Sequence, residues 1–341
     1  MAGRTPLILT AGRDDADRRL DRVLRRALPS LPLSALHRLL RGGSVLVDGK
    51  AAAGEDRVGE GAVITVNGLS GDEPARAADP KAHIVNAAAA ARRTSGAEGG
   101  LDILWRGDGL LVINKPAGLA VHGGQADRGL CLDAMVRGYL AGELPPSLSF
   151  SPGPLHRLDR PTSGIIVFSS DLSGARFFSA MLQGGRVQKQ YLAITDGTVE
   201  EAETWEDELV RDTSLRKTLK TAPGAAGTDG EKGRAALTKV RPLASGPARA
   251  GLAHTLILAE TVTGRTHQIR AQAAVRGHPL SGDKKYGGGQ GGAFFLHAWK
   301  IEIPRPDGGD PLRVTAPLPP RFARKIAELF PGQSGLPGPA G

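Results

Sequence analysis

The most informative stretch of the sequence is HRLDRPTSG, residues 156–164, with the apolar run that follows it, residues 165–168. Four consecutive large apolar residues after a proline and a glycine predict a turn that leads into a buried strand. Asp159 lies just before that turn with an arginine close on either side, and these neighbours are expected to keep its carboxylate ionised at neutral pH. An ionised aspartate at the entrance to a core strand suits a nucleophile or a general base. A structural ion pair fits the same spacing equally well.

Three more strings place polar side chains beside predicted strands. TGRTHQIR, residues 263–270, carries two arginines suited to phosphates or to a carboxylate. VQKQYLA, residues 187–193, puts one of the chain's three tyrosines near a lysine at a strand start. NKPAGLAVH, residues 114–122, puts a lysine before a rigid turn.

The composition indicates a globular chain with a polyanionic partner. Its 341 residues suggest about two domains, and 44 basic against 35 acidic residues give a net charge of +9. A single cysteine excludes an internal disulfide, a multi-cysteine zinc site and a CxxC redox pair. The sequence has no apolar run of about 18 residues and no N-terminal signal pattern, so we expect a soluble cytoplasmic protein. Composition and spacing alone indicate a basic two-domain RNA-binding protein and leave open whether it is an enzyme.

Residues 14–66 are predicted to form a small basic module. Apolar residues recur at helical spacing from Leu20 to Leu28, a second short helix ends at Gly42-Gly43, and two short strands follow. This order resembles the S4 RNA-binding domain, which implies that basic residues of the module contact RNA. Those residues are Arg22, Arg26, Arg38, Arg41 and Lys50. A solvated basic face without a partner is the alternative.

The remainder of the chain is expected to hold a larger domain. Residues 67–100, rich in Gly, Ala, Asp and Pro, predict a linker, and residues 331–341 predict a disordered tail. Between them, residues 101–330 alternate strand-like apolar stretches with helical patterns, which indicates an α+β domain on an antiparallel or mixed sheet. The helical patterns lie at 131–140, 171–184 and 266–276. Residues 213–233, polar and with four glycines, predict a loop.

The four strings, in their order along the chain, resemble the RluA family of pseudouridine synthases, and HRLDxxTSG is the most specific of them. The resemblance covers about residues 14–66 and 102–330. An S4-like module in front is the arrangement of the family's ribosomal members of the RluC type. The resemblance therefore implies an S4 module followed by a pseudouridine synthase domain, and an enzyme that isomerises uridines of large-subunit ribosomal RNA.

The resemblance also implies roles for individual residues. Asp159 is the catalytic carboxylate and acts at the ribose as a nucleophile or as a base. Arg265 pairs with Asp159 and keeps it ionised, while Tyr191 lies against the uracil and helps the C5 proton to leave. Arg157 fills the space that the flipped base vacates. Lys115, Ile269 and Arg270 complete the residues assigned to substrate binding, and the first two are expected to shape the cleft.

RNA is the partner that the resemblance implies, with neither a metal nor an organic cofactor, because the isomerisation is redox-neutral and both bond partners stay in the site. The histidines form no HxxxH pair or Cys/His cluster in the sequence, which disfavours a metal site. We expect a monomer without membrane contact.

Three alternatives stay open. A non-catalytic RNA-binding or ribosome-assembly factor could keep the same fold, although the intact Asp159, Tyr191 and Arg265 argue against it. A synthase of this family could act on transfer RNA, although the S4-like module favours ribosomal RNA. A hydrolase of nucleosides or glycosides normally needs two placed carboxylates, and the central string holds one aspartate.

Overall fold

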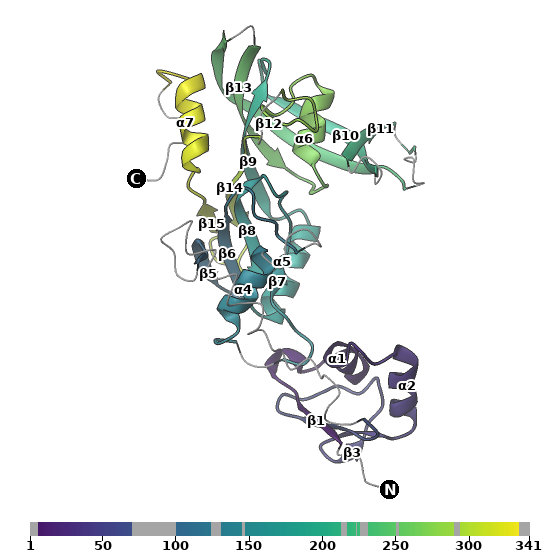
Figure 1. The fold of residues 1–341 in the computed structure, drawn as a ribbon. Coiled ribbons are helices and arrows are strands. Elements are labelled where there is room, and N and C mark those ends of the chain that lie inside the picture. The colour runs from purple at the N-terminus through teal and green to yellow at the C-terminus, as the bar shows by residue number, and fades with distance from the viewer. Residues whose placement is uncertain are drawn as a thin grey trace. The chain divides into compact units, whose positions relative to one another are not determined.

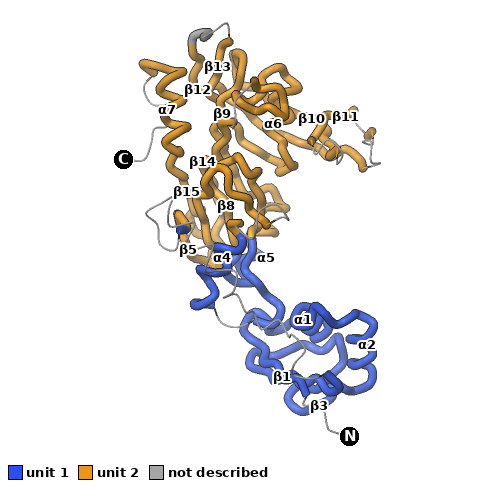
Figure 2. Tube along the Cα trace, viewed as in Figure 1, with its two compact units in different colours: residues 1–100, 133–153, 169–176 blue, residues 101–132, 154–168, 177–341 orange. Residues whose placement is uncertain are grey.

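The computed structural model of the protein describes residues 6–69, 100–123, 131–144, 147–212, 217–222, 224–225, 231–249, 252–289 and 294–333. The chain forms two compact units, which Figure 2 shows in different colours. Unit 1 consists of residues 1–100, 133–153 and 169–176, and unit 2 of residues 101–132, 154–168 and 177–341. Most of the expected linker, residues 70–99, and most of the expected tail, residues 334–341, lie outside the described residues.

Unit 1 contains the small basic module (Figure 1). Its helices are α1 (Leu20–Ala27) and α2 (Leu33–Arg41), and its strands are β1 (Leu7–Thr10), β2 (Val45–Val47), β3 (Lys50–Ala51) and β4 (Val63–Val66). The strands form an antiparallel sheet in the order β1-β4-β2-β3. The apolar positions that predicted the first helix are the buried ones: Leu20, Val23, Leu24 and Ala27.

The module starts before residue 14, where the sequence analysis placed its boundary. Strand β1 pairs with β4 from Leu7 opposite Val66 to Thr10 opposite Val63 and forms one edge of the small sheet. A strand of four residues is too short for its alternation of buried and exposed side chains to stand out in the sequence.

A loop from the middle of the chain completes unit 1. The buried Asp15 carboxylate accepts hydrogen bonds from the backbone N–H groups of Leu148 and Ser149, both at 2.8 Å, and from the Ser147 hydroxyl at 3.0 Å. Leu148 also packs against the hydrophobic core of the module. A buried carboxylate is costly unless it is hydrogen-bonded, so this loop belongs to the fold of unit 1. The compact units therefore do not follow the expected boundaries at 14–66 and 101–330.

Unit 2 is built on one large sheet (Figure 1). Among the described residues the sheet has eleven strands, in the order β11-β10-β12-β13-β9-β14-β8-β6-β5, with β15 beside β14 and β7 beside β8. The strands are β5 (Ile103–Gly107), β6 (Leu110–Lys115), β7 (Gly153–Pro154), β8 (Ser163–Ser169), β9 (Gln188–Asp196), β10 (Glu203–Asp212), β11 (Lys217–Thr221), β12 (Arg234–Arg249), β13 (Leu252–Thr261), β14 (Leu296–Ile303) and β15 (Leu312–Thr315). The helices are α4 (Leu132–Leu140), α5 (Leu172–Gln183), α6 (Gln268–Val275) and α7 (Pro320–Leu329), and α4 and α5 each contain residues of both units.

The sheet is mixed. Strand β14 pairs antiparallel with β9 but parallel with β8, where His297 lies opposite Ser163. This confirms the predicted α+β fold on an antiparallel or mixed sheet, and the three predicted helical patterns correspond to α4, α5 and α6. None of the described helices is long and apolar enough to cross a membrane.

The side chains of β9 alternate between the two faces of the sheet, and their contacts show which helix covers each face. Leu192 and Ile194 pack in one cluster with Phe322 of helix α7. Ala193 packs in another cluster with Ile269 of helix α6. Because successive side chains of a strand point to opposite faces, α6 and α7 cover opposite faces of the sheet (Figure 1). The odd-numbered residues of β9 face α6.

Part of the segment predicted as a loop, residues 213–233, is a strand. Lys217–Thr221 forms β11, which pairs antiparallel with β10 and makes one edge of the large sheet. An edge strand needs no apolar alternation, because one side and much of its surface face water, and so this strand left no pattern in the sequence. Residues 213–216, 223 and 226–230 of the segment lie outside the described residues.

His297 joins β14 to β8 at the parallel pair. Its ring is fully buried, with Nδ1 at 2.9 Å from the Ser163 hydroxyl and Nε2 at 3.4 Å from the carbonyl oxygen of Ala316. Burial lowers the pKa of His297 to about 4, although the Ala316 carbonyl favours the protonated ring. At neutral pH the imidazole is therefore uncharged in the folded protein.

We expect the protein to lose stability as the pH falls from 6.5 toward 4, because the unfolded chain then binds a proton at His297 that the folded chain does not bind. Between pH 6.5 and 4.5 this histidine alone lowers the free energy of unfolding by about 2 kcal/mol. The measurement is urea denaturation of the wild type and of His297→Gln at both pH values. Other buried histidines titrate in both proteins, so equal losses in the two would contradict this role of His297.

Candidate active site

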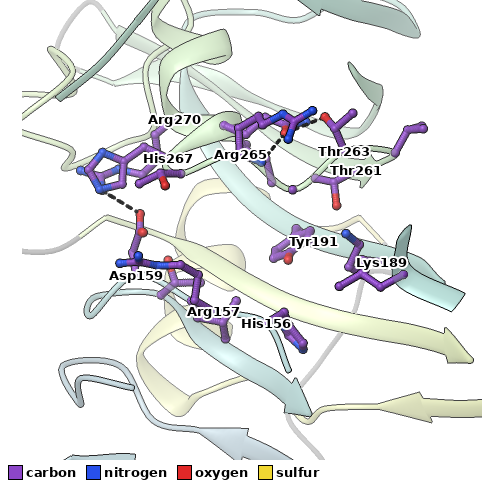
Figure 3. Close-up of a pocket in the computed structure, with 18 of the residues that line it drawn as sticks. His156, Arg157, Asp159, Lys189, Tyr191, Thr261, Thr263, Arg265, His267 and Arg270 are labelled. Atoms are coloured by element: carbon purple, nitrogen blue, oxygen red, sulfur yellow. Dashed lines mark hydrogen bonds and ion pairs between the residues drawn. The ribbon is translucent and has the colours of Figure 1, made fainter. Parts of the chain in front are cut away.

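A cavity of about 470 Å³ opens in unit 2 where several segments of the chain meet, three of which carry predicted site residues (Figure 3). Residues 155–159 lead toward β8, Lys189 and Tyr191 lie near the start of β9, and residues 261–270 run from the end of β13 into α6. Six of the predicted site residues line the cavity: Arg157, Asp159, Tyr191, Arg265, Ile269 and Arg270. The fold thus gathers three of the four strings that the sequence singled out.

A neutral histidine fixes the start of the HRLD string against β8. The backbone N–H of Val167 donates to Nε2 of His156 at 3.1 Å, and the imidazole stacks on the ring of Phe178. Burial, with a smaller contribution from the charge of Lys189, lowers the pKa of His156 to about 3. The unprotonated Nε2 can therefore accept this hydrogen bond at any pH near neutral.

Asp159 lies in the cavity with its carboxylate largely covered. Its side chain is 15% exposed, and Nη1 of Arg270 donates to Oδ2 at 2.8 Å. Nε2 of His267 lies 3.6 Å from the same oxygen, which is too far for a hydrogen bond. Within the described part of the chain no side chain or backbone group donates to the other oxygen, Oδ1. That oxygen is available to a bound molecule.

Arg270 is held by a second carboxylate and by two aromatic rings. Its Nε and Nη2 donate to the two oxygens of Asp283 at 2.7 and 2.9 Å. The guanidinium lies 4.9 Å from the ring centre of Tyr286 and 4.4 Å from that of Phe294. Burial opposes its charge, but Asp283 and Asp159 together raise the pKa of Arg270 above its ordinary value. The cation therefore stays charged and points in a fixed direction toward Asp159.

The predicted pairing of Asp159 with Arg265 is wrong. Arg265 is exposed, and its Nε donates to the carbonyl oxygen of Ala235 at 2.9 Å. Helix α6 begins at Gln268, so Arg265 precedes the helix while Arg270 lies in its first turn. Residues 263–270 contain both arginines, and their sequence does not predict where the helix begins. The position of that helix start decides which arginine reaches the carboxylate.

His267 is a site residue to which the sequence reasoning gave no role. Its backbone is left-handed, with φ 54°, directly before α6. Nδ1 lies 2.9 Å from the hydroxyl of Tyr286, and that oxygen accepts the backbone N–H of Thr218 at 2.8 Å. Burial lowers the pKa of His267 to about 4, although Asp159 pulls it upward. The ring is therefore neutral, and its Nδ1 shares a hydrogen bond with the Tyr286 hydroxyl.

Tyr191 lies on the α6 face of the sheet and lines the same cavity as Asp159 (Figure 3). Burial, reinforced by the charge of Asp159, raises the pKa of its hydroxyl to about 12. The hydroxyl is therefore protonated at neutral pH. The Tyr191 ring packs with the cluster that contains Ile269, so Ile269 forms wall and core, as predicted. A ring in the wall of a cavity suits stacking against a planar ligand.

Lys115 does not line the cavity, contrary to its assignment to substrate binding. Its ammonium group is fully buried and donates to the carbonyl oxygens of Pro116, Leu119 and Arg160 at 3.0, 2.9 and 3.1 Å. Burial lowers the pKa of Lys115 to about 7, with Asp159 opposing and Arg160 adding to this shift. Lys115 therefore ties the turn after β6 to the residue that follows Asp159, and it shapes the cleft from behind.

Two further cationic side chains line the cavity, those of Arg157 and Lys189. Arg157 is exposed, whereas Lys189 is 8% exposed. Within the described part of the chain neither side chain has a hydrogen bond or an ion pair. Arg157 was expected here, while Lys189 stood in the VQKQYLA string without an assigned role. Among the same described residues, no group of three or more His, Cys, Asp or Glu side chains is placed to hold a metal ion.

Comparison with known proteins places this geometry among RNA-modifying enzymes. A family model described as RNA pseudouridylate synthase matches residues 109–275. The chain is 32% identical to ribosomal large subunit pseudouridine synthase C of Pasteurella multocida, over 94% of this chain and 93% of that protein. It is 30% identical to the protein of the same name in Escherichia coli K12, over 93% and 94%.

Two solved human structures resemble the fold. Human RNA Pseudouridylate Synthase Domain Containing 1 matches with a TM-score of 0.52 and 26% identity, over 65% of this chain and 86% of that chain. Human RNA Pseudouridylate Synthase Domain Containing 4 matches with a TM-score of 0.54 and 25% identity, over 72% and 96%.

Arg270→Met is expected to lower the free energy of unfolding by about 3–5 kcal/mol, because it leaves two carboxylates largely buried without their shared cation. Arg265→Met is the matched control and should cost less than about 1 kcal/mol, since an exposed side chain with one hydrogen bond is lost. Urea denaturation at pH 7 measures both. Losses of similar size in the two variants would show that the Asp159–Arg270–Asp283 contacts do not hold the site.

Proposed function

The chain belongs to the RNA pseudouridylate synthase family, and from this premise we propose that it converts specific uridines of large-subunit ribosomal RNA to pseudouridine. The observation that carries the proposal is the ion pair of Asp159 and Arg270 in a cavity that also holds Tyr191. The bacterial relatives named ribosomal large subunit pseudouridine synthase C match over nearly their whole length, which supports ribosomal RNA as the substrate.

The reaction breaks the N1–C1′ bond of a uridine, turns the uracil within the site and joins its C5 to C1′. A carboxylate can attack C1′ as a nucleophile or take a proton from the ribose as a base. Asp159 suits either role, because Arg270 holds one oxygen and leaves the other to the substrate. Since Asp283 in turn fixes Arg270, the carboxylate is oriented before RNA arrives.

Tyr191 is assigned to the uracil. Stacking of a base on an aromatic ring contributes about 1–3 kcal/mol. Because the hydroxyl stays protonated, it acts as a relay when the C5 proton leaves: its oxygen takes that proton while its own proton passes to a solvent molecule in the cavity. Arg157, exposed and unpartnered within the described part of the chain, is assigned to the space that the flipped base vacates in the RNA.

Unit 1 is assigned to RNA binding in the manner of an S4 domain. The five basic side chains predicted to contact RNA are all exposed, and they lie on α1, α2 and β3: Arg22, Arg26, Arg38, Arg41 and Lys50. Exposed cations bind phosphates regardless of base sequence, so these residues supply affinity while the cavity of unit 2 selects and converts the uridine.

The alternatives are a non-catalytic RNA-binding factor, a synthase of transfer RNA and a hydrolase of nucleosides or glycosides. An RNA-binding factor has no use for a carboxylate oriented by a buried arginine, which favours the enzyme. The central motif holds one carboxylate within the cavity, which disfavours a two-carboxylate hydrolase. The cytoplasmic location and the monomeric state stay predictions.

Pseudouridine maps of ribosomal and transfer RNA from cells with and without the gene test the proposed function. We expect one or a few sites in large-subunit ribosomal RNA to disappear with the gene. Loss of sites in transfer RNA alone would favour the second alternative. Unchanged maps of both RNA classes would exclude the enzymatic assignment.

Asp159→Asn is expected to abolish turnover, because it removes the charge that both proposed roles of the carboxylate require. RNA binding should persist, since affinity comes mainly from basic and stacking contacts and losing a negative charge cannot weaken attraction to phosphate. Tritium release from C5-labelled RNA measures turnover, and filter binding measures affinity. Normal turnover by this variant would rule out Asp159 as the reacting group.

Replacement of the five basic residues of unit 1 by glutamine should make the affinity for RNA less dependent on salt. Each lost phosphate contact lowers the slope of log K against log salt by about 0.7–0.9, so the slope should fall by up to about 3.5 to 4.5. Replacing the four arginines by lysine keeps the charge and serves as the control. A slope that is the same in the wild type and the glutamine variant would place RNA binding elsewhere.

A further inference from the structure

Lys189 is a buried cation in the cavity whose charge no other described residue balances. The side chain is 8% exposed and lines the cavity with Tyr191 and Asp159. Within the described part of the chain no acceptor receives a hydrogen bond from its ammonium group. Its Nζ is not among the fully enclosed polar atoms of the described residues, so the ammonium faces the open cavity and its donors are available to a ligand.

The fold aims Lys189 into the cavity. Lys189 precedes Tyr191 by two residues on β9, so both point to the α6 face of the sheet. Its Nζ lies 3.6 Å from where a Cβ would stand on Gly264, so the opposite wall at that point is bare backbone. A side chain at position 264 would occupy the space in front of the ammonium, and the glycine leaves that space to a ligand.

The titratable groups nearby cannot neutralise Lys189. His156 is neutral, with its pKa lowered to about 3 by burial, and Tyr191 is protonated, with its pKa raised to about 12 by burial. The carboxylate of Asp159 already faces Arg270 at 2.8 Å. Burial lowers the pKa of Lys189, and no carboxylate counteracts this shift. No described residue therefore supplies a negative charge to Lys189, and a bound substrate can supply one.

On the basis of the proposed function, we propose that Lys189 binds a carbonyl oxygen of the target uracil and stabilises the negative charge that the ring acquires when the N1–C1′ bond breaks. The electron pair of that bond moves to N1 and is shared with the adjacent carbonyl oxygen. C1′ is captured by the carboxylate of Asp159, or the ribose loses a proton to it. In either route the uracil leaves as an anion, and the ammonium donates a hydrogen bond to it without giving up its proton.

The layout of the cavity favours the uracil over a backbone phosphate. In Figure 3, Tyr191 lies between Asp159 and Lys189. Asp159 marks the place of C1′, so a uracil stacked on Tyr191 extends from there toward Lys189. Phosphates lie on the outer side of the RNA, and the exposed Arg157 and Arg265 are more accessible to them than a lysine at 8% exposure.

The test compares Lys189→Met with the wild type in single-turnover reactions at saturating RNA, with uridine or 5-fluorouridine at the target position. Fluorine withdraws electrons and makes the departing ring anion less basic, so it needs less help from a cation. On uridine we expect a rate loss of about 100-fold, as for removal of one donor to a developing oxyanion. On 5-fluorouridine the loss should be at least about tenfold smaller, and the dissociation constant for RNA should change little. Chromatography of the digested nucleosides follows both substrates.

Two further variants serve as controls. Lys239→Met removes an exposed lysine of β12 outside the cavity and should leave both rates unchanged. Lys189→Arg keeps a cation and a hydrogen-bond donor, so on uridine it should react at least about tenfold faster than Lys189→Met. If Lys189 only fills space, methionine, which is similar in length and apolar, should be the better replacement. This comparison holds even when both variants melt below the wild type.

Equal losses on uridine and 5-fluorouridine, or an unchanged rate in Lys189→Met, would overturn the inference. A change confined to the dissociation constant would make Lys189 a phosphate contact and would also overturn it. If the wild type forms no pseudouridine in the same RNA, the proposed function itself has failed. If the wild type is active and Lys189→Met equals it, the inference alone has failed.

Discussion

One guanidinium shared by two carboxylates is the constraint on which the site depends. Arg270 meets Asp159 at 2.8 Å and Asp283 at 2.7 and 2.9 Å. The turn that carries Asp283 is tightly packed, because a Cβ on Gly288 would come within 1.9 Å of the carbonyl oxygen of Leu280. A rigid turn therefore positions Asp283, which fixes the guanidinium of Arg270. The fixed guanidinium in turn orients the carboxylate of Asp159 in the cavity.

The neutral hydrogen bonds around this ion pair connect it to the edge of the large sheet. The ring of Tyr286 packs against Arg270, and its hydroxyl accepts the backbone N–H of Thr218 and is hydrogen-bonded to Nδ1 of His267. The Thr218 hydroxyl donates to the carbonyl oxygen of Thr266 at 2.9 Å. Strand β11, which holds Thr218, thus supports the segment that leads into α6. Strand β11, which the polar sequence of its segment did not predict, therefore helps to hold the site in place.

Periodicity and motifs in the sequence predicted much of this structure, and their failures have physical causes. The strings around Asp159 and Tyr191 pointed to one site, because chemistry demands particular residue types there. The choice between Arg265 and Arg270 depended on where α6 begins, which is decided by packing against β10, β11 and the core rather than by the string itself. Lys115 was assigned to substrate binding as a residue that shapes the cleft, and three backbone carbonyls from two loops surround its ammonium. The sequence did not predict strands β1 and β11, because short or edge strands show no clear alternation of apolar and polar residues.

Asp159 and Arg270 leave the ribosome at different times, since 111 residues separate them in the chain. Closing so long a loop has an entropic cost that non-local contacts offset only when the sheet between them is in place. Until then the growing chain has a carboxylate but neither its cation nor the cavity around it. The arginines of α1 and α2 are made before residue 42. The surface that we propose to bind RNA is therefore synthesised long before the site that acts on it, and only the finished molecule carries out the chemistry.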